Sequence, residues 1–212
     1  MSSSHPDFFL VIFRVIFCKF ANMKLSLDCS KEKLTINLFW ANIVSFLLIV
    51  PIVLIFGLPY YLLWIDNIDV FLNLWKEEIS PIGLLGFFLA TIFGIIIHEL
   101  IHGITWARYT DNGFKSIKFG ILWKMLTPYC HCKEPLRVKH YIIGGIAPAI
   151  ILGFIPSVIS IIIGNFGLLI FGLLFTVVAS GDFLIINLLR KENKDDFVED
   201  HPSEAGCYIY RK

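Results

Sequence analysis

Long apolar stretches alternate with short polar segments along this chain. Four of the apolar stretches are each long enough to cross a bilayer core of about 30 Å as a helix. They are Leu38–Trp64, Pro81–Trp106, Tyr141–Gly164 and Phe166–Leu189, the last interrupted by Asp182. The connection between the third and fourth is so short that the two helices must be antiparallel neighbours. The pattern predicts an all-α polytopic membrane protein with one four-span domain over residues 38–190.

The polar segment between the second and third stretches has a strand-like pattern. Asp111-Asn112-Gly113 is a turn signal. After it, Phe114–Leu122 partly alternates apolar with basic residues, and Thr127–Glu134 is bounded by Pro128 and Pro135. These features predict a small cytoplasmic β-hairpin between the second and third membrane helices.

The two ends of the chain are more polar than its centre. Residues 1–37 are predicted to form a cytoplasmic N-terminal segment whose apolar part, Phe8–Phe20, lies at the membrane interface. Alternatively, Met23 is the natural start and the residues before it are an upstream extension. Lys24–Asn37 alternates modestly, which favours a short hairpin. Residues 191–212 are predicted to be a cytoplasmic tail whose last apolar alternation could add one strand.

Composition supports the assignment to the membrane. Of the 212 residues, 57% are hydrophobic and 17% charged, with a mean hydropathy of +0.75. Soluble domains have about 45–50% apolar and about 25% charged residues, so an ordinary soluble domain is excluded. The net charge of +1 indicates nothing about partners. The bilayer is the expected environment, and no nucleic-acid partner is expected.

The basic residues indicate an orientation in the membrane. Every Lys and Arg except Lys76 lies before the first span, between the second and third spans, or after the fourth. Basic residues concentrate on the cytoplasmic side, so we expect a multi-pass protein of the bacterial plasma membrane with both termini in the cytoplasm. The cysteines fall on that same side, where they are expected to be reduced and to form no disulfide framework. They are Cys18, Cys29, Cys130, Cys132 and Cys207.

The second apolar stretch contains an HExxH motif, His98-Glu99-Leu100-Ile101-His102. This spacing places two imidazoles on one face of a helix, where both can bind one zinc ion. Glu99 can then act as general base on a zinc-bound water. Ionisable residues inside a membrane span cost about 2.5–3.5 kcal/mol on insertion scales, so they usually mark a functional site.

A catalytic zinc ion takes three protein ligands, and Asp182 is the candidate for the third. Asp182 lies eight residues before Arg190, a depth of about 12 Å of helix. His102 and His98 lie six and ten residues before Arg108, depths of about 9 and 15 Å from the same side. The three side chains are therefore expected to meet in the cytoplasmic half of the bilayer. Ser180 and Gly181 are small enough to let another helix or the metal approach closely.

Other interpretations of these residues remain open. The polar groups inside the membrane could form a structural hydrogen-bond cluster, and Asp182 could bond another helix or extend to the interface. His131 is the next candidate for the third ligand. A separate metal site at Cys130-His131-Cys132 is disfavoured, because alternate residues of a strand point to opposite faces.

These motifs resemble a known family. The chain contains HELIHG, TPYCHCKEPLRVKHY, GGIAPAIILG, SGDFLI and DHPSEAG in that order. They resemble the small bacterial membrane proteins classed as putative zincin peptidases, long a domain of unknown function, from about Lys24 onward. More distantly, the chain is similar to site-2 intramembrane zinc proteases, although its aspartate stands in Ser-Gly-Asp-Phe and no PDZ-like insert is present. The resemblance implies His98, His102 and Asp182 as zinc ligands and Glu99 as base.

The sequence therefore predicts a membrane-embedded zinc metalloprotease with Zn²⁺ as cofactor. Its expected substrates are membrane or membrane-proximal proteins, whose peptide bonds a zinc-activated water hydrolyses. The alternative is a non-catalytic metal-binding membrane protein, such as a sensor, an accessory protein or an inactive relative. That alternative requires the same ligands but gives Glu99 no role. Substrate-binding residues and oligomeric state do not follow from the sequence.

Overall fold

The computed structural model describes residues 30–65, 80–123, 127–201 and 204–211. The predicted interfacial stretch at 8–20 and most of the loop before the second span lie outside these residues. The helical elements are α2 (Leu38–Ile52), η1 (Val53–Gly57), α3 (Leu58–Trp64), α5 (Pro81–Ala107), η3 (Gly113–Ser116), α6 (Val138–Pro148), η4 (Ala149–Phe154), α7 (Ile155–Ile163), α8 (Phe166–Val178) and α9 (Ser180–Leu188). The strands are β1 (Ser30–Thr35), β2 (Ile117–Leu122), β3 (Thr127–Cys132), β4 (Leu136–Arg137), β5 (Phe197–Asp200) and β6 (Gly206–Arg211).

Four helical runs in the described chain are long and apolar enough to cross a membrane. They are Phe39–Trp64, Pro81–Ala107, Val138–Ile163 and Phe166–Leu188. Each agrees within about three residues with the stretch predicted from hydropathy, so the four long apolar helices of the predicted fold are confirmed. The first and third runs each contain a π-helical segment: η1 begins two residues after Pro51, and η4 begins directly after Pro148.

Polar residues set the ends of these helices. Asn37 caps α2 by accepting from the backbone N–H groups of Phe39 and Trp40, and the Ser80 hydroxyl caps α5. Between α7 and α8, Gly164 adopts the left-handed conformation, with φ of 73°, and Asn165 caps α8. This tight turn makes the two helices antiparallel neighbours, as predicted.

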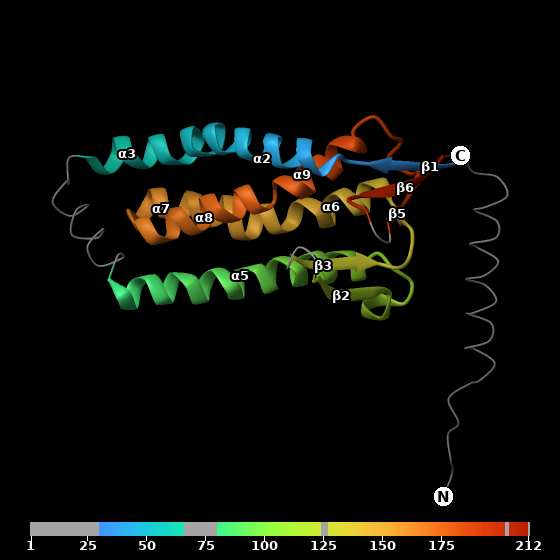
Figure 1. The fold of residues 1–212 in the computed structure, drawn as a ribbon, viewed down its shortest axis with the longest axis horizontal. Helices are drawn as coiled ribbons and strands as arrows, with labels where there is room; N and C mark the ends of the chain where they lie inside the picture. Colours follow the sequence, from blue (N-terminus) through green and yellow to red (C-terminus); the bar gives the residue numbers. More distant parts are fainter. Residues whose placement is uncertain (1–29, 66–79, 124–126, 202–203, 212) are drawn as a thin grey trace, which may run out of the picture.

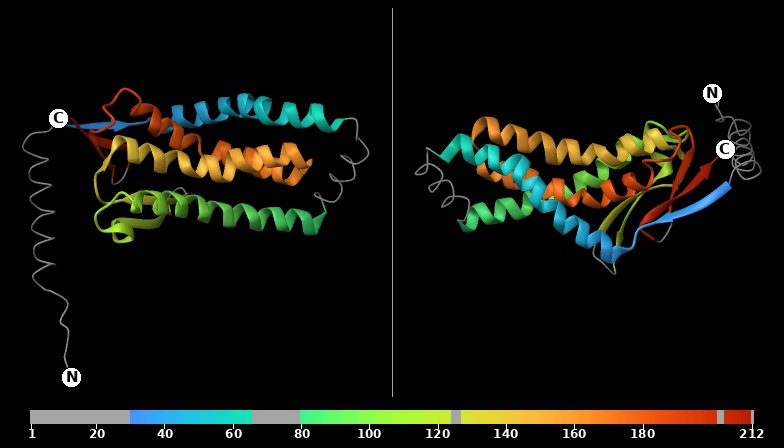
Figure 2. Two further views of the ribbon diagram at one scale, coloured as in Figure 1. Left: turned by 180° about the vertical axis from the view of Figure 1, so that it is seen from behind. Right: turned by 90° about the horizontal axis from the view of Figure 1, so that it is seen from above.

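The helices form a bundle in which the third and fourth runs lie at the centre (Figure 1). Helices α2 and α3 contact α7, α8 and α9 on one side, while α5 contacts α6 and α8 on the other. All six strands gather at one end of the bundle, as the turned views in Figure 2 also show. The C-terminal halves of α5 and of the α8–α9 run therefore both lie near the end of the bundle that carries the strands.

Two antiparallel sheets occupy that end. Strands β2 and β3 follow α5 and precede α6 in the sequence. They pair with each other and place Phe119 opposite Cys130. A second, four-stranded sheet has the order β1–β6–β5–β4 and pairs Ser30 with Arg211. This second sheet was not predicted, so the all-α description is incomplete. Of the hairpin expected at 24–37, residues 24–29 lie outside the described residues, and the described part contains strand β1, which pairs with β6.

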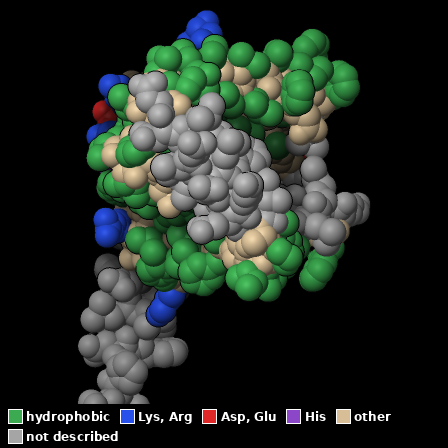
Figure 3. Space-filling view, turned by 90° about the vertical axis from the view of Figure 1, so that its left-hand side faces the viewer, with side chains coloured by type: hydrophobic (Ala, Val, Ile, Leu, Met, Phe, Trp, Pro, Cys, Tyr) green, Lys and Arg blue, Asp and Glu red, His purple; other side chains and the backbone are tan. Residues whose placement is uncertain are grey.

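The outer surfaces of the helical runs are apolar. Large exposed side chains include Phe46, Phe93 and Ile162, which are 74%, 64% and 71% exposed. Viewed from the end of α3 and α7, hydrophobic side chains cover most of the described surface, and Lys and Arg lie at its outline (Figure 3). In water such a surface would be strongly unfavourable, whereas hydrocarbon chains solvate it, which supports a membrane protein.

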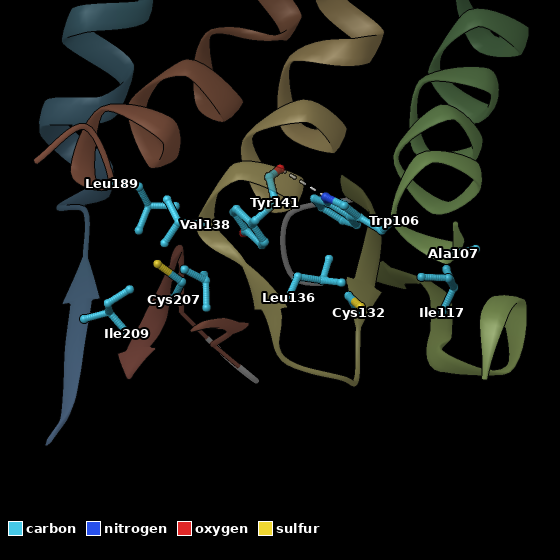
Figure 4. Close-up of a cluster of buried hydrophobic side chains, with 11 residues drawn as sticks. Trp106, Ala107, Ile117, Cys132, Leu136, Val138, Tyr141, Leu189, Cys207 and Ile209 are labelled. Carbon is cyan, nitrogen blue, oxygen red and sulfur yellow. Dashed lines mark hydrogen bonds between the residues drawn. The ribbon is translucent and has the colours of Figure 1, made fainter. Parts of the chain in front are cut away.

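The largest buried cluster joins the helices to the strands (Figure 4). It combines Trp106 of α5, Tyr141 of α6 and Leu189 after α9 with side chains of both sheets. Val198 of β5 and Ile209 of β6 are fully buried in it. The strands are therefore packed against the ends of the helices that carry the HExxH motif and Asp182.

Candidate metal centre

Helix α5 presents the two histidines of the motif on one face, one turn apart. His98 and His102 are each only 4% exposed although the helix is otherwise largely apolar. Side chains at positions i and i+4 of a helix point to the same side, so both imidazoles face the centre of the bundle. Trp106 continues this face by one further turn and is also buried.

Helix α9 supplies the carboxylate. The fourth membrane run is broken at Ala179, which is fully buried and has a ψ near 0°. Asp182 consequently lies in the first turn of α9, where the N-terminal end of a helix favours a negative charge. Ser180 follows this break directly. Its hydroxyl lies 2.6 Å from the hydroxyl of Ser45 in α2, which links the start of α9 to the first membrane run.

The three side chains predicted as ligands meet between α5 and α9. Nε2 of His98 lies 3.2 Å from Nε2 of His102 and 3.2 Å from Oδ2 of Asp182. Nε2 of His102 lies 3.4 Å from Oδ1 of Asp182. Ligands about 2.0–2.1 Å from a tetrahedral zinc ion stand about 3.3–3.4 Å apart. The separations here are measured to both carboxylate oxygens of Asp182; with one donor atom taken from each side chain, the three lie within 4.8 Å of one another, so this donor group can hold zinc. With three protein donors, one position of the tetrahedron stays open for water or substrate.

A backbone carbonyl orients one of the imidazoles. Nδ1 of His102 lies 2.8 Å from the carbonyl oxygen of Gly144 in α6. A carbonyl can only accept, so Nδ1 carries the proton and donates it, and in the neutral imidazole the lone pair is on Nε2. That is the nitrogen directed at His98 and Asp182. Metal-binding histidines usually have such a partner on the second nitrogen.

Stacked aromatic rings pack against the face of the His102 imidazole. Its ring stacks on Trp106 with centroids 5.0 Å apart, and Trp106 stacks on Tyr141 at 5.2 Å. The indole N–H of Trp106 donates to the carbonyl of Tyr141 at 3.1 Å, the bond drawn in Figure 4. A Cβ at Gly144 would lie 2.0 Å from Nε1 of Trp106, so only glycine leaves room for the indole.

Glu99 lies beside the histidines and faces the two-stranded sheet. It is half-buried, and its carboxylate interacts with the backbone N–H group of Cys130 in β3. The sheet packs closely here, because Gly103 leaves room for the Phe119 ring of β2. A general base must lie within hydrogen-bond reach of the proton that it abstracts, and the position of Glu99 next to the two histidines is compatible with that condition.

Two acidic residues outside the membrane helices anchor β3. Asp200 of β5 accepts from the backbone N–H of Cys132 at 2.8 Å and from the Tyr141 hydroxyl at 2.6 Å. Burial raises the pKa of Asp200 above its usual range, although these hydrogen bonds oppose the shift. Glu134 accepts from Ser116 and Asn112; burial opposes ionisation, but these bonds prevail and the pKa of Glu134 is lowered.

Other candidates from the sequence lie elsewhere. Nδ1 of His131 is 3.7 Å from Asp200, and His131 does not belong to the metal-donor group found among the described residues. Gly181 is exposed, and no atom lies within 4 Å of where its Cβ would be, so the expected close approach there is wrong. Among the described residues, Nδ1 of His98 is buried without a hydrogen-bond partner.

The sequence reasoning missed the residues that support the ligands. Trp106 could have been found, since it continues the spacing of His98 and His102 by four residues. Gly144 could have been suspected from Pro148, which follows it by four residues and has no N–H to give its carbonyl. Asp200 gave no local signal, because its partners Cys132 and Tyr141 lie about 60 or more positions earlier in the chain.

A family model matches this chain. The family described as "Putative zincin peptidase" matches residues 91–197, just over half of the chain. The matched range includes the HExxH motif, Gly144, Pro148 and Asp182. Searches of curated proteins and of solved structures each gave no match.

Proposed function

The chain belongs to the family described as "Putative zincin peptidase", and from this premise we propose that it is a membrane-embedded zinc metalloprotease. The observation that carries the proposal is the donor triangle of His98, His102 and Asp182, in which the two Nε2 atoms lie 3.2 Å apart and each is 3.2–3.4 Å from one oxygen of the Asp182 carboxylate. Glu99 adjoins this triangle inside a membrane helix, where a carboxylate without a function would be costly.

Each residue of the site has a separate role in the proposed hydrolysis. Zinc, when bound, supplies a Lewis acid that polarises a carbonyl and lowers the pKa of water toward about 7. Glu99 takes a proton from the attacking water on its carboxylate and returns it to the leaving amine. His102 is held by Gly144 so that it donates no proton toward the reacting atoms, and Asp182 offsets the positive charge at the centre.

The edge of β3 offers a place for the substrate backbone. The backbone N–H groups of Cys130 and Cys132 point away from β2, toward Glu99 and Asp200. In an antiparallel pair the carbonyl of the same residue points the same way, so the Cys130 carbonyl is also on this edge. The N–H groups of Cys130 and Cys132 already donate to Glu99 and Asp200, so an unwound segment of a membrane or membrane-proximal protein pairs with β3 through the Cys130 carbonyl, beside Glu99. Unwinding is required because a helical peptide bond is shielded by its own hydrogen bonds.

The experiment that tests this function compares wild type with Glu99→Gln on a single-span membrane protein as substrate. Glu99 is a base and not a ligand, so the variant is expected to keep zinc and lose about 10²–10⁴-fold in turnover. Glu204→Gln is the matched control and should keep its activity, because Glu204 is an exposed carboxylate that pairs with Lys33 away from the site. Normal turnover of Glu99→Gln would contradict hydrolysis by this mechanism. Zinc binding without turnover of any tested protein by wild type would favour the non-catalytic metal-binding alternative.

A further inference from the structure

Helix α6 contains Pro148, four residues after Gly144, whose carbonyl oxygen bonds Nδ1 of His102. In a regular helix the N–H of residue 148 would donate to the carbonyl of Gly144, four residues earlier. Residue 148 is a proline, which has no N–H and whose ring pushes against that carbonyl. The Gly144 carbonyl therefore loses its regular helical donor.

The following residue does not replace the missing donor. The N–H of Ala149 donates to the carbonyl of Ile146, and the chain then continues as the π-helix η4. Freed carbonyls inside a membrane must be satisfied by a neighbouring group. At Gly144 that group is the imidazole of His102 on α5, at 2.8 Å.

The surroundings leave little freedom for another arrangement. Pro148 is fully buried, and His102 is 4% exposed. Trp106 fills the space beside Gly144 and stacks on the His102 ring, so the imidazole is held between the indole and the carbonyl. A carbonyl that accepts from Nδ1 selects one tautomer of the imidazole and so decides which nitrogen is available to a metal ion.

We propose that Pro148 is a positioning residue for the metal centre. By removing the helical donor to the Gly144 carbonyl, Pro148 makes that carbonyl the acceptor for Nδ1–H of His102. Nε2 is thereby kept as the free lone pair facing His98 and Asp182. The inference rests on the proposed zinc site but concerns the histidine even without metal.

The chain offers a matched control for this proline. Pro156 lies in the same membrane run, near the start of α7, and by the same rule it frees the carbonyl of Leu152. Pro156→Ala and Pro148→Ala thus make the same chemical change in one helix, but only the second restores a donor to the carbonyl that His102 uses.

The test combines nitrogen NMR of ¹⁵N-histidine-labelled protein in detergent with zinc titration against a chromophoric chelator. Metal-free wild type is expected to have the His102 proton on Nδ1, with the signal assigned by its loss in His102→Ala. Pro148→Ala should give a mixture of tautomers and bind zinc about 10–100-fold more weakly. Pro156→Ala should keep both the tautomer and the zinc affinity of wild type.

Three results would overturn the proposal: a wild-type His102 protonated on Nε2, a Pro148→Ala protein that behaves like wild type, or an equal loss in Pro156→Ala. If Pro148→Ala does not fold, the tautomer of His102 in the wild type is the deciding measurement. A proton on Nε2 overturns the proposal, and a proton on Nδ1 supports it. A wild-type protein with the expected tautomer but no zinc affinity would instead refute the proposed function and leave the positioning by Pro148 standing.

Discussion

His98 and Asp182 are 84 positions apart in the sequence, and their side chains meet with Nε2 3.2 Å from Oδ2. The contact joins the second membrane helix to the fourth. It depends on the break at Ala179, which starts a new helix just before Asp182 and directs its carboxylate toward α5. The candidate metal centre is thus a property of the packed bundle and not of the HExxH motif alone.

Replacement of Asp182 tests this contact directly. Asp182→Asn keeps the size of the side chain but removes the negative charge and one strong oxygen donor, so zinc affinity should fall sharply. The bundle should remain folded, because the amide can still bond an imidazole. Zinc titration of the purified variant measures the effect, with Asp195→Asn on the exposed loop after α9 as control. Unchanged zinc affinity in Asp182→Asn would remove Asp182 from the ligand set.

Two glycines near the site should respond in opposite ways to the same substitution. Gly144→Ala places a Cβ 2.0 Å from the indole nitrogen of Trp106, which must shift and so disturb the stack on His102. Overpacking of this kind costs about 1–3 kcal/mol of stability. Gly181→Ala meets no atom within 4 Å and should be tolerated or gain about 0.5–1 kcal/mol in its helix.

Thermal unfolding in detergent compares the two variants. A lower midpoint for Gly144→Ala together with an unchanged or higher midpoint for Gly181→Ala is expected. Equal midpoints for the two variants would show that the indole does not fill the space beside Gly144 as described.

Asp200 predicts a pH dependence of stability. Burial raises its folded-state pKa above the usual value near 3.9, so the folded state binds the proton more tightly than the unfolded state does. The contribution of Asp200 to stability is therefore greatest at low pH and decreases as pH rises from about 4 through the raised folded pKa. Asp200→Asn, which does not titrate, should show a flatter profile over this window. The measurement is unfolding against pH; the same slope in both proteins would contradict the raised pKa.

The orientation predicted from the basic residues can be tested by cysteine labelling. Native Cys132 and Cys207 are poor reporters, because they are 2% and 0% exposed and burial raises the pKa of each thiol to about 12. Introduced cysteines serve better. An impermeant reagent in intact cells should label Lys76→Cys, on the predicted outer loop, and should label Lys133→Cys only after permeabilisation. Labelling of Lys133→Cys in intact cells would reverse the orientation.

Local patterns predicted the membrane helices well, since hydropathy is a property of consecutive residues. Local residues mark the start of α5 at Ser80-Pro81 and the start of α8 at Gly164-Asn165, where capping groups and turn residues coincide. The approach of Asp182 to the two histidines followed from helix depth, because a membrane restricts where a given residue can lie. The ligand role of these residues stays a prediction.

The second sheet could not be predicted in the same way. Ser30 pairs with Arg211, so the two strands come from opposite ends of the chain, and neither sequence encodes its partner locally. The segments were visible only as weak alternations, which fit a single strand or a hairpin equally. Asp200 and the stack of Trp106 on Tyr141 depend on that packing and were missed for the same reason.

The zinc content of purified protein tests the central claim most directly. Wild type loaded with zinc and washed should retain about one ion per chain, while His98→Ala and His102→Ala should each lose it. His131→Ala is the matched histidine control and should retain the ion, since His131 lies against Asp200 and not in the donor triangle. Retention of stoichiometric zinc by both His98→Ala and His102→Ala, or a wild-type protein that holds none, would contradict the account.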